Sequence, residues 1–329
     1  MPVDTTEHAH GNNYCLDHPG LPDPMLPPLT RRQADRMVQL ALTAAADLGL
    51  SLTYRGGSAL VPVDRSTDDP VLGLSNLART VGRFEEDRWP ELVAEHVEVV
   101  LEQYRAGSAV PADPERDLIQ RIVARDSLPA EWTVDRPDVL PGLISVPSME
   151  KDGLITMFLQ PSDFGLSWPE ADRFGLANLR RLEDDVTLVE EHDIRLAFVN
   201  GSGYAASRVL VLDTVLRDSL QVPDAPFGVL AALPARDTLI LHVIEDLGVI
   251  PALGLMVNLA ARGYARDPGP LSPEVYLVTP ELVWHRATVP LTDETSLRPS
   301  AEFGALVRQL AIREQRCDDD DSQRPGGAK

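Results

Sequence analysis

The segment from Phe227 to Asp246, FGVLAALPARDTLILHVIED, consists of two apolar runs separated by the polar turn Pro234–Asp237. Each run has the length of a β-strand, and Pro and Asp both favour turns. The second run presents two alternating faces, one with Leu239, Leu241 and Val243 and the other with Thr238, Ile240, His242 and Ile244. Both faces are mostly apolar, so both should be covered. We therefore expect a β-hairpin at the centre of a sheet that is packed on both sides.

Helical patterns surround this hairpin. Amphipathic periodicity predicts helices at about 30–47, 88–104 and 169–182, and two more after residues 250 and 300. Short β-prone runs lie between them, and the run DLIQRIVAR is interpreted as a further short helix. Strands and helices do not follow a regular βαβ order. The sequence therefore predicts an α+β fold with a mainly antiparallel sheet covered by helices.

Composition shifts along the chain suggest four parts. Residues 1–29 are rich in proline and predict a flexible arm, and residues 317–329 predict a flexible acidic tail. Residues 30–106 predict a small helix–hairpin–helix unit. Residues 107–316, which include the central hairpin, predict a larger α+β domain.

The charge of the chain limits its partners. The 329 residues carry a formal net charge of −21. Binding to nucleic acid or to an anionic membrane surface needs clustered Lys and Arg, so we expect neither. A basic protein partner is compatible with this charge, and the oligomeric state stays open. We expect a cytoplasmic protein, because no apolar run approaches the roughly 20 residues that span a bilayer and no secretory signal is visible.

Metal-binding residue types occur together only in the proline-rich arm, which contains His8, His10, Cys15 and His18. Imidazole and thiolate groups are the ligands that zinc prefers. Their spacing fits no standard zinc finger, and the flanking prolines supply no scaffold. We therefore expect a plain tail without a metal or another cofactor.

An acidic stripe lies on the helix predicted at 88–104. Its members recur at steps of four, three and four residues and are Glu91, Glu95, Glu98 and Glu102. One interpretation is a docking face for a basic partner, and the other is an ordinary solvated helix face.

Four residues are candidates for ligand binding. Asn178 falls on the buried arc of its helix, where an amide either ties the helix to a backbone carbonyl or contacts a ligand. Arg208 starts the apolar segment after the turn at Gly201. Arg236 and Asp237 lie at the hairpin turn, where they could hold an anionic substrate or form an internal ion pair. His242, on a strand apolar on both faces, is expected to be a core residue.

Catalytic motifs are missing from the sequence. It contains no G-x-S-x-G, H-E-x-x-H, Walker loop or C-x-x-C pattern. We therefore assign no catalytic residue, and we lean towards a protein that is not an enzyme.

Several stretches resemble one family. They are LGLSNLARTVGRF, FGLANLRR, YAASRVLVLD, VLAALPARDTLIL and LSPEVY, in this order along the chain. In order and spacing they resemble the YtpQ-like family of bacterial proteins of unknown function. The resemblance covers roughly residues 30 to 285 and implies a cytosolic bacterial protein with one continuous α+β fold. It brings no activity, cofactor or catalytic residue.

Two hypotheses for function follow. The favoured one is a non-catalytic acidic protein that binds or regulates a macromolecular partner. The alternative is an enzyme or small-molecule binder that holds an anionic ligand near Asn178, Arg208 and Arg236.

Overall fold

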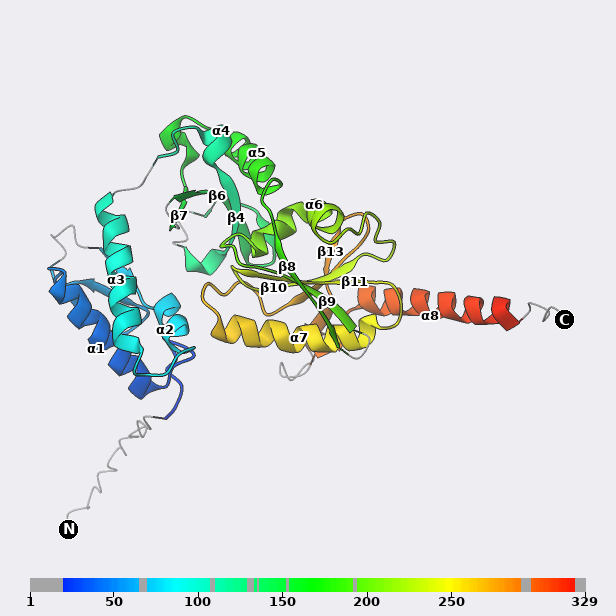
Figure 1. Ribbon diagram of the computed structural model, residues 1–329, viewed down its shortest axis with the longest axis horizontal. Coiled ribbons are helices and arrows are strands. Elements are labelled where there is room, and N and C mark those ends of the chain that lie inside the picture. Colours follow the sequence, from blue (N-terminus) through cyan, green and yellow to red (C-terminus); the bar gives the residue numbers. More distant parts are fainter. Residues whose placement is uncertain are drawn as a thin grey trace, which may run out of the picture. The chain divides into compact units, whose positions relative to one another are not determined.

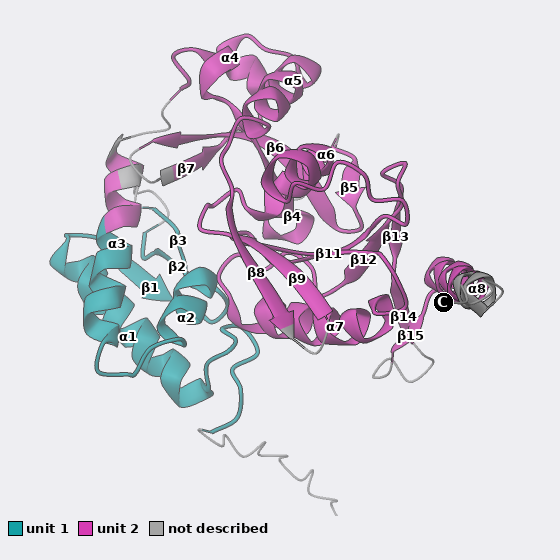
Figure 2. Ribbon diagram, turned by 45° about the vertical axis from the view of Figure 1, so that its right-hand side comes forward, with its two compact units in different colours: residues 1–98 teal, residues 99–329 magenta. Residues whose placement is uncertain are grey.

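The structure is a computed structural model that describes residues 20–64, 70–106, 110–128, 133–134, 136–151, 154–191, 194–290 and 297–322. The candidate metal ligands of the arm, which are His8, His10, Cys15 and His18, lie outside these residues. The chain forms two compact units, residues 1–98 and 99–329 (Figure 2). The boundary falls inside the continuous helix α3 (Trp89–Ala106).

The first unit contains the helices α1 (Arg31–Asp47) and α2 (Ser75–Val81), the first part of α3 and a small antiparallel sheet (Figure 1). Helix α1 starts with a capping box between Thr30 and Gln33, which satisfies backbone donors at its N-terminus. The sheet order is β1 (Leu52–Tyr54), β2 (Ala59–Pro62) and β3 (Leu72–Gly73), and α2 follows it. The sequence predicts the helix and the hairpin, and it also predicts a strand end that leads into a helix near Ser75, where β3 and α2 lie.

Part of the proline-rich arm packs against the protein. Leu26 and Leu29 are fully buried, and the main chain around them forms hydrogen bonds with Asp23. The segment from residue 20 to 29 is therefore structured, in contrast to the flexible arm expected there.

The second unit is built on a six-stranded antiparallel sheet. Its order is β13 (Trp284–Arg286), β12 (Val275–Val278), β10 (Val229–Ala235), β11 (Thr238–Val243), β9 (Ile194–Asn200) and β8 (Asp185–Glu191). The predicted hairpin is β10–β11, and it occupies the two central positions. Pro234 belongs to β10 and not to the turn, because the register shifts between Ala232 and Ala235 and the strand continues to Ala235, which pairs with Thr238.

Both faces of this sheet are covered, as the sequence predicts. Leu239 and Leu241 lie in a core that also contains Ala206, Val209 and Leu212. The other core contains Ile240, Ile244 and residues of α7 (Val249–Arg266) and α8 (Ala301–Ser322). Figure 1 shows α7 along one face of the sheet and α6 (Leu212–Thr214) on the other. The α+β class with an antiparallel sheet is therefore confirmed.

A second antiparallel sheet of the same unit consists of β4 (Ile119–Ala124), β6 (Leu143–Lys151), β5 (Asp138–Leu140) and β7 (Leu154–Met157). The short helix expected in DLIQRIVAR is wrong. Residues 119–124 form the strand β4, because each of them pairs with a residue of β6. Helix α5 (Trp168–Leu179) packs so closely on β4 that a Cβ at Gly175 would lie 2.6 Å from Gln120 Oε1.

The segment SRVLVLDTVLRDSL after the Gly201 turn, whose apolar pattern predicts a single helix, is less regular in the structure. It consists of a 3₁₀ helix η4 (Ala206–Val211), one α-turn α6 and a π-helix η5 (Val215–Ser219). The remaining elements are α4 (Pro114–Asp117), η1 (Arg125–Ser127), η3 (Pro161–Phe164), β14 (Thr288–Pro290) and β15 (Leu297–Pro299). Helix α8 continues to Ser322, so the first residues of the acidic tail are helical. Among the described helices, none has the length and apolar character needed to cross a membrane.

Candidate functional site

Asn178 holds α5 against the start of β4. Its Nδ2 donates to the backbone oxygens of Glu115 and Leu118, both at 2.8 Å, and its Oδ1 accepts a hydrogen bond from Arg181. The side chain is buried. All of these contacts are internal, so they match the structural amide that the sequence offered as an alternative.

Arg208 forms a buried ion pair. Its Nε lies 2.6 Å from Asp184 Oδ1, its Nη2 donates to Asp184 Oδ2, and its Nη1 contacts the backbone oxygen of Leu179. Ser219 also donates to Asp184 Oδ2. Arg208 therefore links η4 to the end of α5 and to the residue before β8, and its charge is compensated inside the fold.

Arg236 and Asp237 form the turn between β10 and β11 and are half-buried. The backbone of Arg236 is held by two hydrogen bonds. Its N–H donates to the backbone oxygen of Gly269, and its own oxygen accepts from the N–H of Ala206. Its side chain lies against Gly269, where a Cβ would be 2.6 Å from Arg236 Cδ. Within the described part of the chain, no ion pair involves Arg236 or Asp237. The four sequence candidates therefore do not meet at one point.

A residue that the sequence did not single out lies beside Arg236. Arg121, on β4, is only 7% exposed, and its guanidinium carbon lies 5.9 Å from the centre of the Tyr204 ring. That distance permits a cation–π interaction. The Tyr204 hydroxyl lies 3.2 Å from the buried hydroxyl of Ser148. Arg121 has no carboxylate ion-pair partner among the described residues.

The segment Tyr204–Ser207 brings the two arginines together. On one side, the backbone N–H of Ile122 donates to Ser207 Oγ at 2.9 Å, next to Arg121. On the other side, the backbone N–H of Ala206 donates to the Arg236 oxygen at 3.2 Å. One short segment thus joins the central hairpin turn to the second sheet, with the Arg121 guanidinium over the Tyr204 ring and the Arg236 backbone bonded to Ala206.

The electrostatics of this pair are unfavourable in the absence of an anion. Burial, and then the positive charge of Arg236, lower the pKa of Arg121, while Tyr204 and Glu150 oppose that change. An arginine keeps its charge at neutral pH even so. A buried cation near a second cation is costly unless an anion compensates it, and the negative charge of Glu150 acts in that direction. The arrangement suits a phosphate or carboxylate group.

The acidic stripe lies on an exposed face of α3. Glu91, Glu95, Glu98 and Glu102 are all exposed. Glu91 pairs with Arg88 on the same helix, whereas the other three have no ion-pair partner in the described ranges. This face can attract a cationic surface, and nothing in its geometry distinguishes it from a solvated helix face.

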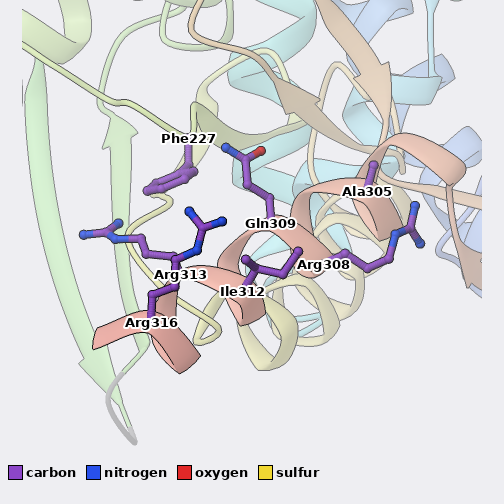
Figure 3. A pocket seen from close by; sticks show the side chains of 7 residues that line it. All are labelled: Phe227, Ala305, Arg308, Gln309, Ile312, Arg313 and Arg316. Atoms are coloured by element: carbon purple, nitrogen blue, oxygen red, sulfur yellow. The ribbon is translucent and has the colours of Figure 1, made fainter. Parts of the chain in front are cut away.

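A groove of about 570 Å³ runs beside α8 (Figure 3). Arg313 lies over the ring of Phe227, with the guanidinium carbon 5.0 Å from the ring centre. Arg308, Ile312 and Arg316 also line the groove. Its character is therefore apolar and basic.

His242 is a buried residue of the central sheet. The His242 ring is buried, and its Nδ1 lies 2.9 Å from the backbone oxygen of Arg195, as expected for a satisfied core histidine. Over the residues that the structure describes, no group of three His, Cys, Asp or Glu side chains is positioned to hold a metal ion.

Comparison of the chain with protein-family models, curated proteins and solved structures finds no significant match. The resemblance to the YtpQ-like family stays a prediction. The function must therefore be argued from the chain's own geometry.

Proposed function

We propose that this protein binds a small ligand that carries a phosphate or carboxylate group, and that Arg121 and Arg236 hold this group. The observation that carries the proposal is a charged Arg121 that is 7% exposed, lacks a described carboxylate partner and lies near a second arginine. An anion between the two guanidinium groups would remove the cost of burying that charge.

Binding, not catalysis, is the simplest activity for such a site. The sequence has no standard catalytic motif. Tyr204 supplies an aromatic face beside Arg121, and burial raises the pKa of its hydroxyl, so this group stays protonated at neutral pH. A protonated hydroxyl and two guanidinium groups recognise an oxyanion by hydrogen bonding.

The proposal is tested by calorimetric titration with inorganic phosphate and, separately, with acetate. We expect the wild-type protein to bind one of them, and Arg121→Gln or Arg236→Gln to weaken that binding at least tenfold. The control is Arg298→Gln, because Arg298 is an exposed arginine on β15. Equal affinities in all four proteins, or no binding by the wild type, would contradict the proposal.

A second candidate function is recognition of a basic protein by the acidic face of α3. It is favoured by the exposure of Glu95, Glu98 and Glu102 and by their lack of described ion-pair partners. Reversal of these three charges to Lys should abolish any salt-sensitive complex captured by the wild-type protein. The matched control reverses three exposed acids elsewhere: Asp126, Asp224 and Glu302. If both triple variants lose the complex equally, net charge and not the α3 face controls binding.

A further inference from the structure

A second, smaller cavity lies in the 99–329 unit. Its volume is about 290 Å³, and it is bounded by β4, by the segment from η4 to α6 and by the turn between β12 and β13. Apolar residues such as Ile122, Leu140, Val209, Leu212 and Trp284 line it together with the charged side chains of Arg180 and Asp213, and polar and apolar atoms share its surface. Trp284 is fixed by an edge-to-face contact with Tyr276, with ring centres 5.9 Å apart. The cavity therefore has a rigid aromatic wall.

One polar pair lies among these apolar residues. Arg180 Nη1 donates to both carboxylate oxygens of Asp213, at 2.8 and 2.9 Å, and to Thr214 Oγ1. All described contacts of the guanidinium use this one nitrogen, so its Nε and Nη2 donors have no acceptor in the part of the chain that the structure covers. Asp213, in contrast, already accepts two hydrogen bonds. The hydrogen-bond donors of the cavity that have no described acceptor thus belong to a cationic group, the Arg180 guanidinium.

Two irregular features of the backbone border the cavity. Leu282 has a φ of 60°, which is rare for a leucine, and 45% of it is exposed. The π-helix η5 begins directly after α6. Strained residues and π-helical turns both occur often at functional sites. Both features therefore support a binding role for this cavity.

We propose that this cavity binds a small apolar or aromatic monocarboxylate, with its body against Trp284 and its carboxylate on the free donors of Arg180. The volume lies at the lower end of the range for small-molecule sites, which limits the ligand to a single ring or a short branched chain. This site is separate from Arg121 and Arg236, so it goes beyond the proposed function and does not depend on it.

The test uses phenylacetate and its uncharged analogue phenylacetamide, each titrated into the full chain and followed by ligand-observed NMR. We expect the wild type to bind phenylacetate at least tenfold more tightly than phenylacetamide. Arg180→Gln should remove this preference, because it removes the donors for the carboxylate. Val139→Trp should weaken both ligands at least tenfold, since Val139 lies on the partly exposed edge of the cavity and a larger side chain would fill it.

One control variant separates this site from others. Arg217 also forms an exposed pair with a neighbouring aspartate but does not line the cavity, so Arg217→Gln should bind phenylacetate like the wild type. Absence of phenylacetate binding up to 5 mM (about 3 kcal/mol of binding free energy), or binding that survives Val139→Trp in a folded protein, would overturn the proposal.

Discussion

Arg208 and Asp184 form an ion pair whose side chains are only 2% and 3% exposed, with Arg208 Nε 2.6 Å from Asp184 Oδ1. Arg121 is buried almost as deeply but has no such carboxylate among the described residues. The fold thus contains one buried arginine that forms an ion pair with a carboxylate and one that forms none among the described residues. We propose that the first arginine is structural and that the second binds a ligand, which leads to opposite expectations for stability.

Arg208→Met should strongly destabilise the protein. The substitution leaves the Asp184 carboxylate buried without its cation, which costs about 3–5 kcal/mol in comparable cases. Urea denaturation measures the change in the free energy of unfolding. Arg180→Gln is the control, because its pair with Asp213 is exposed and should contribute at most about 1 kcal/mol. An equally small loss of unfolding free energy in both variants would mean that the buried carboxylate of Asp184 does not need Arg208 as its counter-ion.

Arg121→Met should leave the melting temperature of the ligand-free protein unchanged or raise it. The substitution removes a buried charge that no described carboxylate compensates, and it keeps the apolar stem. A gain of about 1 kcal/mol would raise the melting temperature by roughly 2–4 °C. Differential scanning calorimetry in buffer without phosphate provides the measurement. A loss of several degrees would show that Arg121 has a structural role.

Asn178→Leu should destabilise the protein without changing its affinity for phosphate. The variant leaves the backbone oxygens of Glu115 and Leu118 without their donor, at a cost of about 1–3 kcal/mol. Chemical denaturation and phosphate titration are measured on the same preparation. If phosphate affinity falls while stability is kept, Asn178 contacts the ligand after all.

Stability should decline as the pH rises above about 10. Burial raises the pKa of Tyr204 above its ordinary value of 10.0. The unfolded chain then releases a proton that the folded state retains, so alkaline pH favours unfolding. Tyr276 behaves in the same way, again because of burial. Denaturation midpoints are measured between pH 9 and 11, a window of about one unit on each side of that pKa. They should fall less steeply with rising pH in Tyr204→Phe than in the wild type. Parallel curves for variant and wild type would exclude Tyr204 as the source.

The central hairpin could be predicted because each of its strands is a continuous apolar run of strand length and the two runs are joined by turn residues. A short apolar run bounded by turn residues is a local signal for a buried strand. The amide of Asn178 was also predictable as a structural tie, since an inward-facing amide must find a partner. Both features could be predicted because they depend mainly on residues that are close in the sequence.

The Arg121 site could not be predicted in the same way. The run from Ile119 to Ala124 is too short for its period to distinguish a helix from a strand, and the helix interpretation was wrong. Arg121 comes near Arg236 only because the segment Tyr204–Ser207 is hydrogen-bonded to strands of two sheets that are far apart in the sequence. The available signal was a single charged residue inside an apolar run, which in a buried strand calls for a partner.

The pairing of Arg121 with Arg236 around an anion is tested most directly by diffraction from crystals soaked in tungstate, a strongly scattering analogue of phosphate. The account predicts an anomalous peak within hydrogen-bonding distance of both guanidinium groups, and its loss in Arg121→Gln crystals. A carboxylate of the protein itself bound to Arg121, or peaks only at other arginines, would contradict it.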